Sequence, residues 1–266
     1  MWTRKKIMDK FNDHMTESLQ YFNENHIVGL FLQGSQNYGL ELPDSDVDTK
    51  LIITPSLKEI ASNAKPISTT HIRANNEHID FKDIRLYMET FRKQNINFME
   101  ILFTNYFKVN PLYADYWQLL LDNREEIAHM NPYRAVKAMK GMASEKYFSM
   151  EHHYPSKEAT LAKFGYDPKQ LHHLLRVEDF MKNYLTGVPY LDCLKPSNPD
   201  FLLQIKKGAY NLDKARAAAK ISYEHIEEME KTYCDNHKES EDLCIRELLE
   251  ETQYNIIKTS IKNELQ

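Results

Sequence analysis

The segment IVGLFLQGSQNYGLELPDSDVDTKLII, residues 27–53, is the stretch from which the fold can be predicted. An apolar run ends at Gly34, a turn-rich connection follows, and a second apolar run opens with Asp46-Val47-Asp48. Short apolar runs that are partly β-branched and bounded by turn residues are typical of buried strands. The segment therefore predicts two strands joined by a loop. The rest of the chain is expected to pack around these two strands.

The Gly-Ser pair that ends the first run, Gly34-Ser35, is a candidate anion site. Backbone N–H groups at a loop or helix start can bind an anion. Gly34 has no Cβ to block its approach, and the Ser35 hydroxyl can donate to a phosphate oxygen. The following Asn37-Tyr38-Gly39 has the composition of a turn. We therefore expect a phosphate-binding turn at residues 34 and 35.

The second run opens with two carboxylates, Asp46 and Asp48. Because side chains alternate along a strand, both are expected on one face, with Cα atoms roughly 6.5 Å apart. Two carboxylates this close repel each other unless cations join them. Hard oxygen ligands beside a phosphate site suit Mg²⁺, and two such ions can stabilise an in-line displacement. The pattern predicts a site for two Mg²⁺ ions, or Mn²⁺ in their place, that needs a third carboxylate.

A strand predicted at residues 78–81 supplies the third acid. Its two apolar residues share one face, which puts Asp80 on the other face together with His78. Asp80 is therefore the third predicted metal ligand. Two other acids compete for this role: Glu77 lies at the strand start, and Asp83 fits the N-terminus of a following helix, where a carboxylate acts as a cap.

The pattern Gly-Ser, ten residues, Asp-x-Asp resembles the signature of the DNA polymerase β superfamily of nucleotidyltransferases. In that superfamily the Gly-Ser pair holds the nucleoside triphosphate, and the two aspartates, with a third on a later strand, hold two Mg²⁺ ions. The resemblance implies that Gly34, Ser35 and the three aspartates form the site, and we add Tyr38 as a nucleotide-binding residue. The alternative is a coincidental turn before an exposed acidic strand start.

The segment DFKDIRLYMETFRKQNINFMEILFT, residues 80–104, narrows the resemblance. It is similar to a subfamily of bacterial and phage predicted nucleotidyltransferases that is associated with RNA repair. That resemblance implies that four polar residues shape the site: Lys93, Asn95, Asn97 and Glu100. Ile96 departs from the proline usual in the family. Taken singly, the four residues fit a polar helix junction with capping amides equally well.

Beyond Pro111 the sequence is typical of helices. We therefore predict an α+β fold with two domains: a nucleotidyltransferase palm with a small mixed sheet at residues 1–110, and an α-helical domain at residues 111–266 that closes the nucleotide cleft.

One helix of the second domain, predicted at residues 168–185, carries Lys169, His173 and Arg176 at positions i, i+4 and i+7 of one face. Three donors on one face could hold a triphosphate. The subfamily resemblance extends to this helix through Tyr166-Asp167-Pro168-Lys169, and it favours this nucleotide-binding role. From spacing alone, the alternative is a solvated basic face.

Composition limits the partners. The formal net charge is −5, with a mildly basic middle third and an acidic C-terminal segment, so strong binding of duplex DNA is not expected. No apolar segment approaches the length of a membrane span. The 3 cysteines are widely spaced, which suits a reducing compartment, and we expect a cytoplasmic protein.

Together these features predict a metal-dependent nucleotidyltransferase that moves a nucleoside monophosphate from an NTP to an acceptor hydroxyl. An RNA 3′ end is the favoured acceptor, through the subfamily association and the basic middle third. Two alternatives remain: transfer to a protein hydroxyl, as in AMPylases, and a nucleotide-binding regulatory or antitoxin-like protein that has the fold without turnover.

Overall fold

The structure is a computed structural model that describes residues 2–266. The chain divides into two compact units: the first runs to Met130 and also includes Glu241–Gln266, and the second is Asn131–Ser240. The fold is mixed α/β. Among the described residues, all five strands lie in the first unit and form one sheet, and the second unit is helical.

The sheet has the strand order β3-β4-β2-β1-β5. Its central pair, β1 and β2, is antiparallel, β2 and β4 are parallel, and the two outer pairs are antiparallel. The strands have the following bounds: β1 Ile27–Gln33, β2 Asp48–Ile53, β3 Ser68–Ile72, β4 His78–Asp83 and β5 Phe107–Val109.

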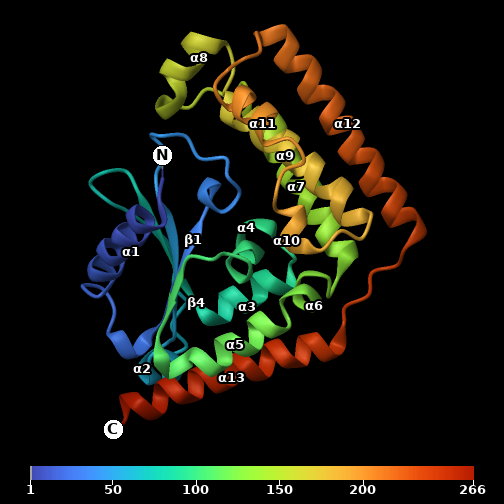
Figure 1. The fold of residues 1–266 in the computed structure, drawn as a ribbon. Coiled ribbons are helices and arrows are strands. Elements are labelled where there is room, and N and C mark those ends of the chain that lie inside the picture. The colour runs from blue at the N-terminus through green and yellow to red at the C-terminus, as the bar shows by residue number, and fades with distance from the viewer. Residues whose placement is uncertain (1) are drawn as a thin grey trace. The chain divides into compact units, whose positions relative to one another are not determined.

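Helices cover both faces of this sheet, with α1 on one side and α3 and α4 on the other (Figure 1). Between α1 and the sheet lies a hydrophobic core cluster that includes Phe11 of α1, Leu32 of β1 and Leu51 of β2. These three residues are each 0% exposed. The helices of the first unit are α1 Arg4–Ser18, α2 Leu57–Ala61, α3 Ile84–Arg92, α4 Ile96–Met99, α5 Ala114–Asp122, α6 Arg124–Ala128 and α13 Leu243–Glu264.

The C-terminal helix α13 returns to the first unit and packs on α3 and α5. The hydroxyls of Ser260 and Thr54 lie 2.6 Å apart, and both residues are buried. In α5, Trp117 packs on Phe31 of β1, with ring centroids 4.3 Å apart. The division therefore differs from the predicted one at Pro111, because α5, α6 and α13 bury their apolar residues in the first unit.

The second unit is organised around α9, which packs on α7, α11 and α12. Apolar residues at helical spacing fill the interface, and Leu174 of α9 and Met139 of α7 are both 0% exposed. Its helices are α7 Pro132–Ser149, α8 Glu158–Phe164, α9 Pro168–Leu185, α10 Tyr190–Cys193, α11 Pro199–Lys206 and α12 Leu212–Asn236. The helix predicted at residues 168–185 is confirmed as α9, with the predicted bounds.

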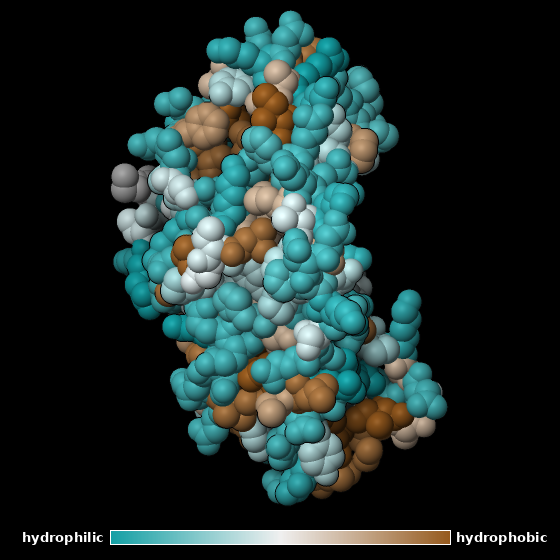
Figure 2. Space-filling view, turned by 90° about the vertical axis from the view of Figure 1, so that its right-hand side faces the viewer, coloured by the Kyte–Doolittle hydropathy of each residue, from teal (hydrophilic) through white to brown (hydrophobic). Residues whose placement is uncertain are grey.

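One face of the molecule is largely hydrophilic, with hydrophobic residues in several separate areas (Figure 2). Within residues 2–266, none of the helices combines the length and the hydrophobicity that a membrane crossing requires.

Candidate functional site

The strand register brings the central part of the predicted site to one end of the sheet. Gln33, the last residue of β1, lies opposite Asp48, the first residue of β2. In the parallel pair β2 and β4, Lys50 lies opposite Asp80. The Gly34-Ser35 turn, which follows β1, therefore lies at the same end as both aspartates.

A row of polar side chains crosses four neighbouring strands at this end. Gln33 of β1 donates from Nε2 to Oδ2 of Asp80, at 3.3 Å, and Lys50 of β2 donates from Nζ to Oε1 of Gln33. The Lys50 Nζ lies 3.6 Å from Oδ2 of Asp80. Thr70 of β3 donates its hydroxyl to Oδ1 of Asp80, at 2.6 Å. Asp80 is thus held through both of its carboxylate oxygens.

Lys50 is the most buried member of this row, at 3% exposure. The ring of Phe98, in α4, covers its ammonium group at 4.5 Å from the ring centroid. Burial lowers the pKa of Lys50 to about 8, against the opposing effect of Asp80 and, more weakly, Asp48. Lys50 therefore carries a positive charge at pH 7 beside two of the predicted metal ligands.

The two aspartates at the start of β2 differ in their surroundings. Asp48 has a side-chain exposure of 32%, and its Oδ1 accepts the backbone N–H of His78 at 2.9 Å. Asp46 is exposed and precedes the strand, which begins at Asp48 rather than at Asp46 as predicted. The backbone carbonyl of Asp46 accepts a hydrogen bond from the Gln36 side chain at 2.6 Å. The turn thus anchors the backbone of Asp46.

The Gly34-Ser35 turn has a backbone conformation that favours glycine. Gly34 has φ +98° and caps a short 3₁₀ helix, Ser35–Asn37, so an L side chain would be strained here. The N–H of Gly34 donates to Oε1 of Glu100, at 3.3 Å, and Glu100 is 5% exposed. Tyr38 is also buried, at 7% exposure. A phosphate that used the Gly34 N–H would therefore have to displace the Glu100 carboxylate.

The donor set matches the chemistry of a hard divalent cation. Asp48 and Asp80 present carboxylate oxygens on one face of neighbouring strands, with side-chain exposures of 32% and 28%. Such oxygens suit Mg²⁺ or Mn²⁺. Throughout residues 2–266, however, no three His, Cys, Asp or Glu side chains are grouped so that they could hold an ion. The residues suit a divalent ion chemically, but binding would require a rearrangement around Asp80.

The alternative acids have structural partners. Asp83 caps α3 as predicted, since it accepts the backbone N–H of Arg85 at 2.9 Å. Glu77 is 4% exposed and accepts hydrogen bonds from Arg73, at 2.8 Å, and from His14, at 3.1 Å. Both acids therefore stabilise the fold directly.

The residues of the junction between α3 and α4 fit the capping interpretation, with one exception. Asn95 is the N-cap of α4 and accepts the backbone N–H of Asn97 at 3.0 Å. Lys93 lies 3.6 Å from the Glu89 carboxylate on the helix surface. Glu100 is the exception, because it contacts the Gly34 turn.

On α9, the three residues of the predicted nucleotide-binding face differ in exposure. Lys169 is exposed, whereas His173 and Arg176 are partly buried. Burial lowers the pKa of His173 well below its ordinary value, and the neighbouring His172 and Arg176 act in the same direction. At pH 7 His173 is therefore neutral and can act as a hydrogen-bond donor, but not as a cation. His172 is 2% exposed and its Nδ1 lies 3.0 Å from the Leu202 carbonyl.

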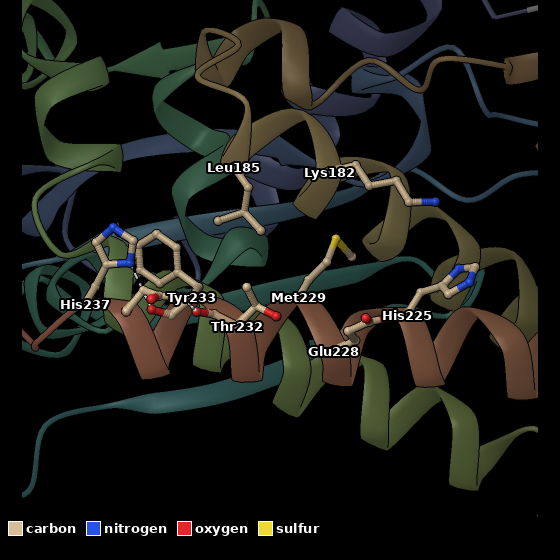
Figure 3. Close-up of a pocket in the computed structure, with 9 residues that line it drawn as sticks. Lys182, Leu185, His225, Glu228, Met229, Thr232, Tyr233 and His237 are labelled. Carbon is tan, nitrogen blue, oxygen red and sulfur yellow. Dashed lines mark hydrogen bonds between the residues drawn. The ribbon is translucent and has the colours of Figure 1, made fainter.

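A separate groove of about 660 Å³ lies between α9 and α12 in the second unit (Figure 3). Leu185 and Met229 line it together with Tyr233, whose ring stacks on His237 at 4.1 Å between centroids. Lys182 also lines the groove, and its ammonium group pairs with the Glu178 carboxylate. None of the predicted site residues lines this groove.

The sequence alone did not predict the polar row that holds Asp80, which consists of Gln33, Lys50 and Thr70. A signal for Lys50 was present, because a lysine two residues after Asp48 interrupts an otherwise apolar strand on the same face. The contacts of Gln33 and Thr70 depend on the strand order, which the sequence does not specify.

No protein-family model matches this chain. A search of curated proteins likewise finds no match.

Proposed function

We propose that this protein is a metal-dependent nucleotidyltransferase that transfers a nucleoside monophosphate from an NTP to the 3′ hydroxyl of an RNA. The observation that carries the proposal is the strand register, in which the Gly34-Ser35 turn, Asp48 and Asp80 lie at one end of the sheet. A phosphate-binding turn beside partly exposed carboxylates is the arrangement that in-line phosphoryl chemistry requires.

In the proposed reaction, the acceptor oxygen forms a bond to the α-phosphorus of the NTP. The bond from that phosphorus to the oxygen that bridges to the β-phosphate breaks, and pyrophosphate leaves. The proton of the acceptor hydroxyl passes to a carboxylate oxygen of Asp80 where Asp80 is the base, or to water where Asp80 serves only as a metal ligand. The hydroxyl of Ser35 and the ring of Tyr38 orient the nucleotide.

Asp46, Asp48 and Asp80 are the residues that would hold two Mg²⁺ ions. When bound, these ions would stabilise the charge on the attacking and leaving oxygens. On α9, Lys169 and Arg176 would supply charge to the triphosphate, and neutral His173 would donate a hydrogen bond to it.

RNA is proposed as the acceptor on two grounds. The subfamily that the sequence resembles is associated with RNA repair, and residues 111–220 carry a small excess of basic residues. A single-stranded end requires less positive charge than a duplex, which fits the overall charge of −5.

The test is transfer of label from α-³²P-labelled NTPs, with Mg²⁺ and total RNA, in the wild-type protein and in Asp46→Asn, Asp48→Asn and Asp80→Asn. We expect label on RNA with the wild-type protein, reduced at least about a hundredfold in each variant. Asp44→Asn is the matched control: Asp44 is an exposed acid in the same connection, and its variant should retain wild-type transfer.

The other outcomes would contradict the proposal in distinct ways. Label on protein instead of RNA would indicate an AMPylase-type enzyme with the same site. NTP binding without any labelled product, in RNA or in cell lysate, would favour a regulatory protein. Transfer that persists in all three variants would exclude these aspartates from the reaction.

A further inference from the structure

Lys50 is a buried cation for which the proposed reaction has no role. A lysine with 3% exposure is costly unless its charge is paired. Its ammonium group pairs with Asp80, 3.6 Å away, and donates to Gln33. Its ammonium group also lies over the ring of Phe98, 4.5 Å from the ring centroid. The fold therefore places a positive charge at this position and holds it there.

The charge stands where two predicted metal ligands would otherwise repel each other. Asp48 precedes Lys50 by two residues and lies on the same strand face, and Asp80 lies opposite Lys50 in the parallel register. Thr70 of the neighbouring strand β3 donates to Oδ1 of Asp80, and Gln33 of β1, on the far side of β2, donates to Oδ2. Lys50 thus supplies the neutralising charge that a divalent cation would otherwise supply.

We propose that Lys50 is a positioning residue whose ammonium group serves as an internal counter-ion for Asp48 and Asp80, and that a divalent cation must displace it from Asp80 to bind. This inference rests on the proposed function, because it assumes that these carboxylates are metal ligands. Its consequence is that the carboxylates stay paired until a metal ion arrives. Two cations that compete for one carboxylate weaken each other's binding reciprocally.

The test is isothermal titration of the full-length protein with MgCl₂ alone. In Lys50→Met and Lys50→Gln the competing charge is gone, so we expect the apparent Kd for Mg²⁺ to fall by about fivefold or more. A residue with a merely structural role would give the opposite result, because its loss would loosen Asp80 and weaken metal binding. Circular dichroism spectra of both variants establish that they fold.

Lys82→Met is the matched control. Lys82 lies on the same sheet face, and its ammonium group also lies over Phe98, at 4.2 Å. The charge of Asp80 raises the pKa of Lys82 against burial, but among residues 2–266 no carboxylate lies within ion-pair distance of its ammonium group. Its variant should keep the wild-type Kd within about twofold. Equal tightening in Lys82→Met would overturn the proposal, since it would reflect a general loss of positive charge.

Failure of this inference can be distinguished from failure of the proposed function. If the wild-type protein binds Mg²⁺, Asp48→Asn abolishes binding, and neither Lys50 variant binds more tightly, then the role of Lys50 is wrong and the metal site stands. If the wild-type protein and Asp48→Asn give the same titration, both proposals fail together.

Discussion

Glu77 is the acid whose protonation should most affect the fold. It is 4% exposed, and its carboxylate contacts His14, Lys10 and Arg73. Burial alone would raise the pKa of Glu77, but hydrogen bonds from Asn75, His14 and Lys10 outweigh burial and lower the pKa to about 2. This cluster joins α1 to the turn between β3 and β4, so it links two elements that the sequence separates widely.

The pKa shifts predict a loss of stability in acid. Because the pKa of Glu77 is lowered from 4.5 to about 2, its contribution is complete above pH 4.5 and is lost as the pH falls toward 2. Burial also lowers the pKa of His14 below 6.5 in the folded protein. As the pH falls below 6.5, His14 is therefore protonated more readily in the unfolded state than in the folded state, and the protein loses stability. We therefore expect the free energy of unfolding, measured in urea, to decrease steadily from pH 7 to pH 3.

Glu77→Gln tests the origin of this dependence. At pH 7 the variant should lose about 1–3 kcal/mol, because Arg73 and Lys10 lose a charged hydrogen-bond acceptor, although Arg73 keeps its ion pair with Glu17. Below pH 4.5 its stability should fall less steeply than that of the wild-type protein. Glu89→Gln, a change at a partly exposed carboxylate with a side-chain exposure of 42%, should have little effect at either pH. Parallel pH curves for the wild-type protein and Glu77→Gln would contradict this explanation.

At the candidate site, the sequence pattern predicted the position of some residues but not of others. The alternation of side chains along β4 correctly placed Asp80 on the face of the strand that does not carry the buried Ile79 and Phe81. The same rule applied to β2 extended the strand back to Asp46, where the turn in fact continues. Lys50 could have been noticed, but its pairing with Asp80 could not, because the contact depends on the parallel pairing of β2 with β4.

At the scale of elements, α9 offers a sharp contrast between two adjacent histidines. His172 is 2% exposed and contacts the Leu202 carbonyl of α11, whereas His173 lies on the partly exposed side with Arg176. The sequence predicted the helix and its basic face from spacing. It could not distinguish the binding role from a solvated surface, because that depends on what faces the helix.

The prediction for α9 separates binding from stability. Arg176→Ala should weaken NTP affinity by about ten- to a hundredfold, the range for loss of a charged hydrogen bond, with a nearly unchanged thermal midpoint. His173→Ala should act in the same direction. His172→Ala should instead lower the thermal midpoint and leave NTP affinity unchanged in the folded protein. Equilibrium dialysis with labelled NTP and thermal denaturation measure the two quantities, and the reverse pattern would make His173 and Arg176 structural.

The helix boundaries were predictable where capping residues mark them. Ser56 and Glu59 form a capping box at α2, and Asp83 caps α3 as predicted. The end of the first helix is harder to predict from the sequence: apolar residues continue at helical spacing to Phe22, but α1 ends at Ser18 and Leu19 is 46% exposed. Apolar periodicity alone does not determine where a helix stops.

At the scale of the whole molecule, the sequence predicted the change from a strand-containing first part to a helical second part. It did not predict that α13 returns to the first unit, where Ile256 and Leu249 are both 0% exposed. An amphipathic helix must bury its apolar face, but its sequence does not say against which partner. The predicted domain boundary at Pro111 therefore reflects a local helix-breaking residue and not the packing of the helices.

The central claim is that Asp48 and Asp80 hold divalent ions beneath a nucleotide at the end of β1. The most direct measurement is Mn²⁺ binding in the presence of a non-hydrolysable NTP, followed by the electron paramagnetic resonance signal of free Mn²⁺. We expect two ions per wild-type chain, loss of binding in Asp48→Asn and Asp80→Asn, and wild-type binding in Asp44→Asn. Unchanged Mn²⁺ binding in Asp48→Asn and Asp80→Asn would contradict the account.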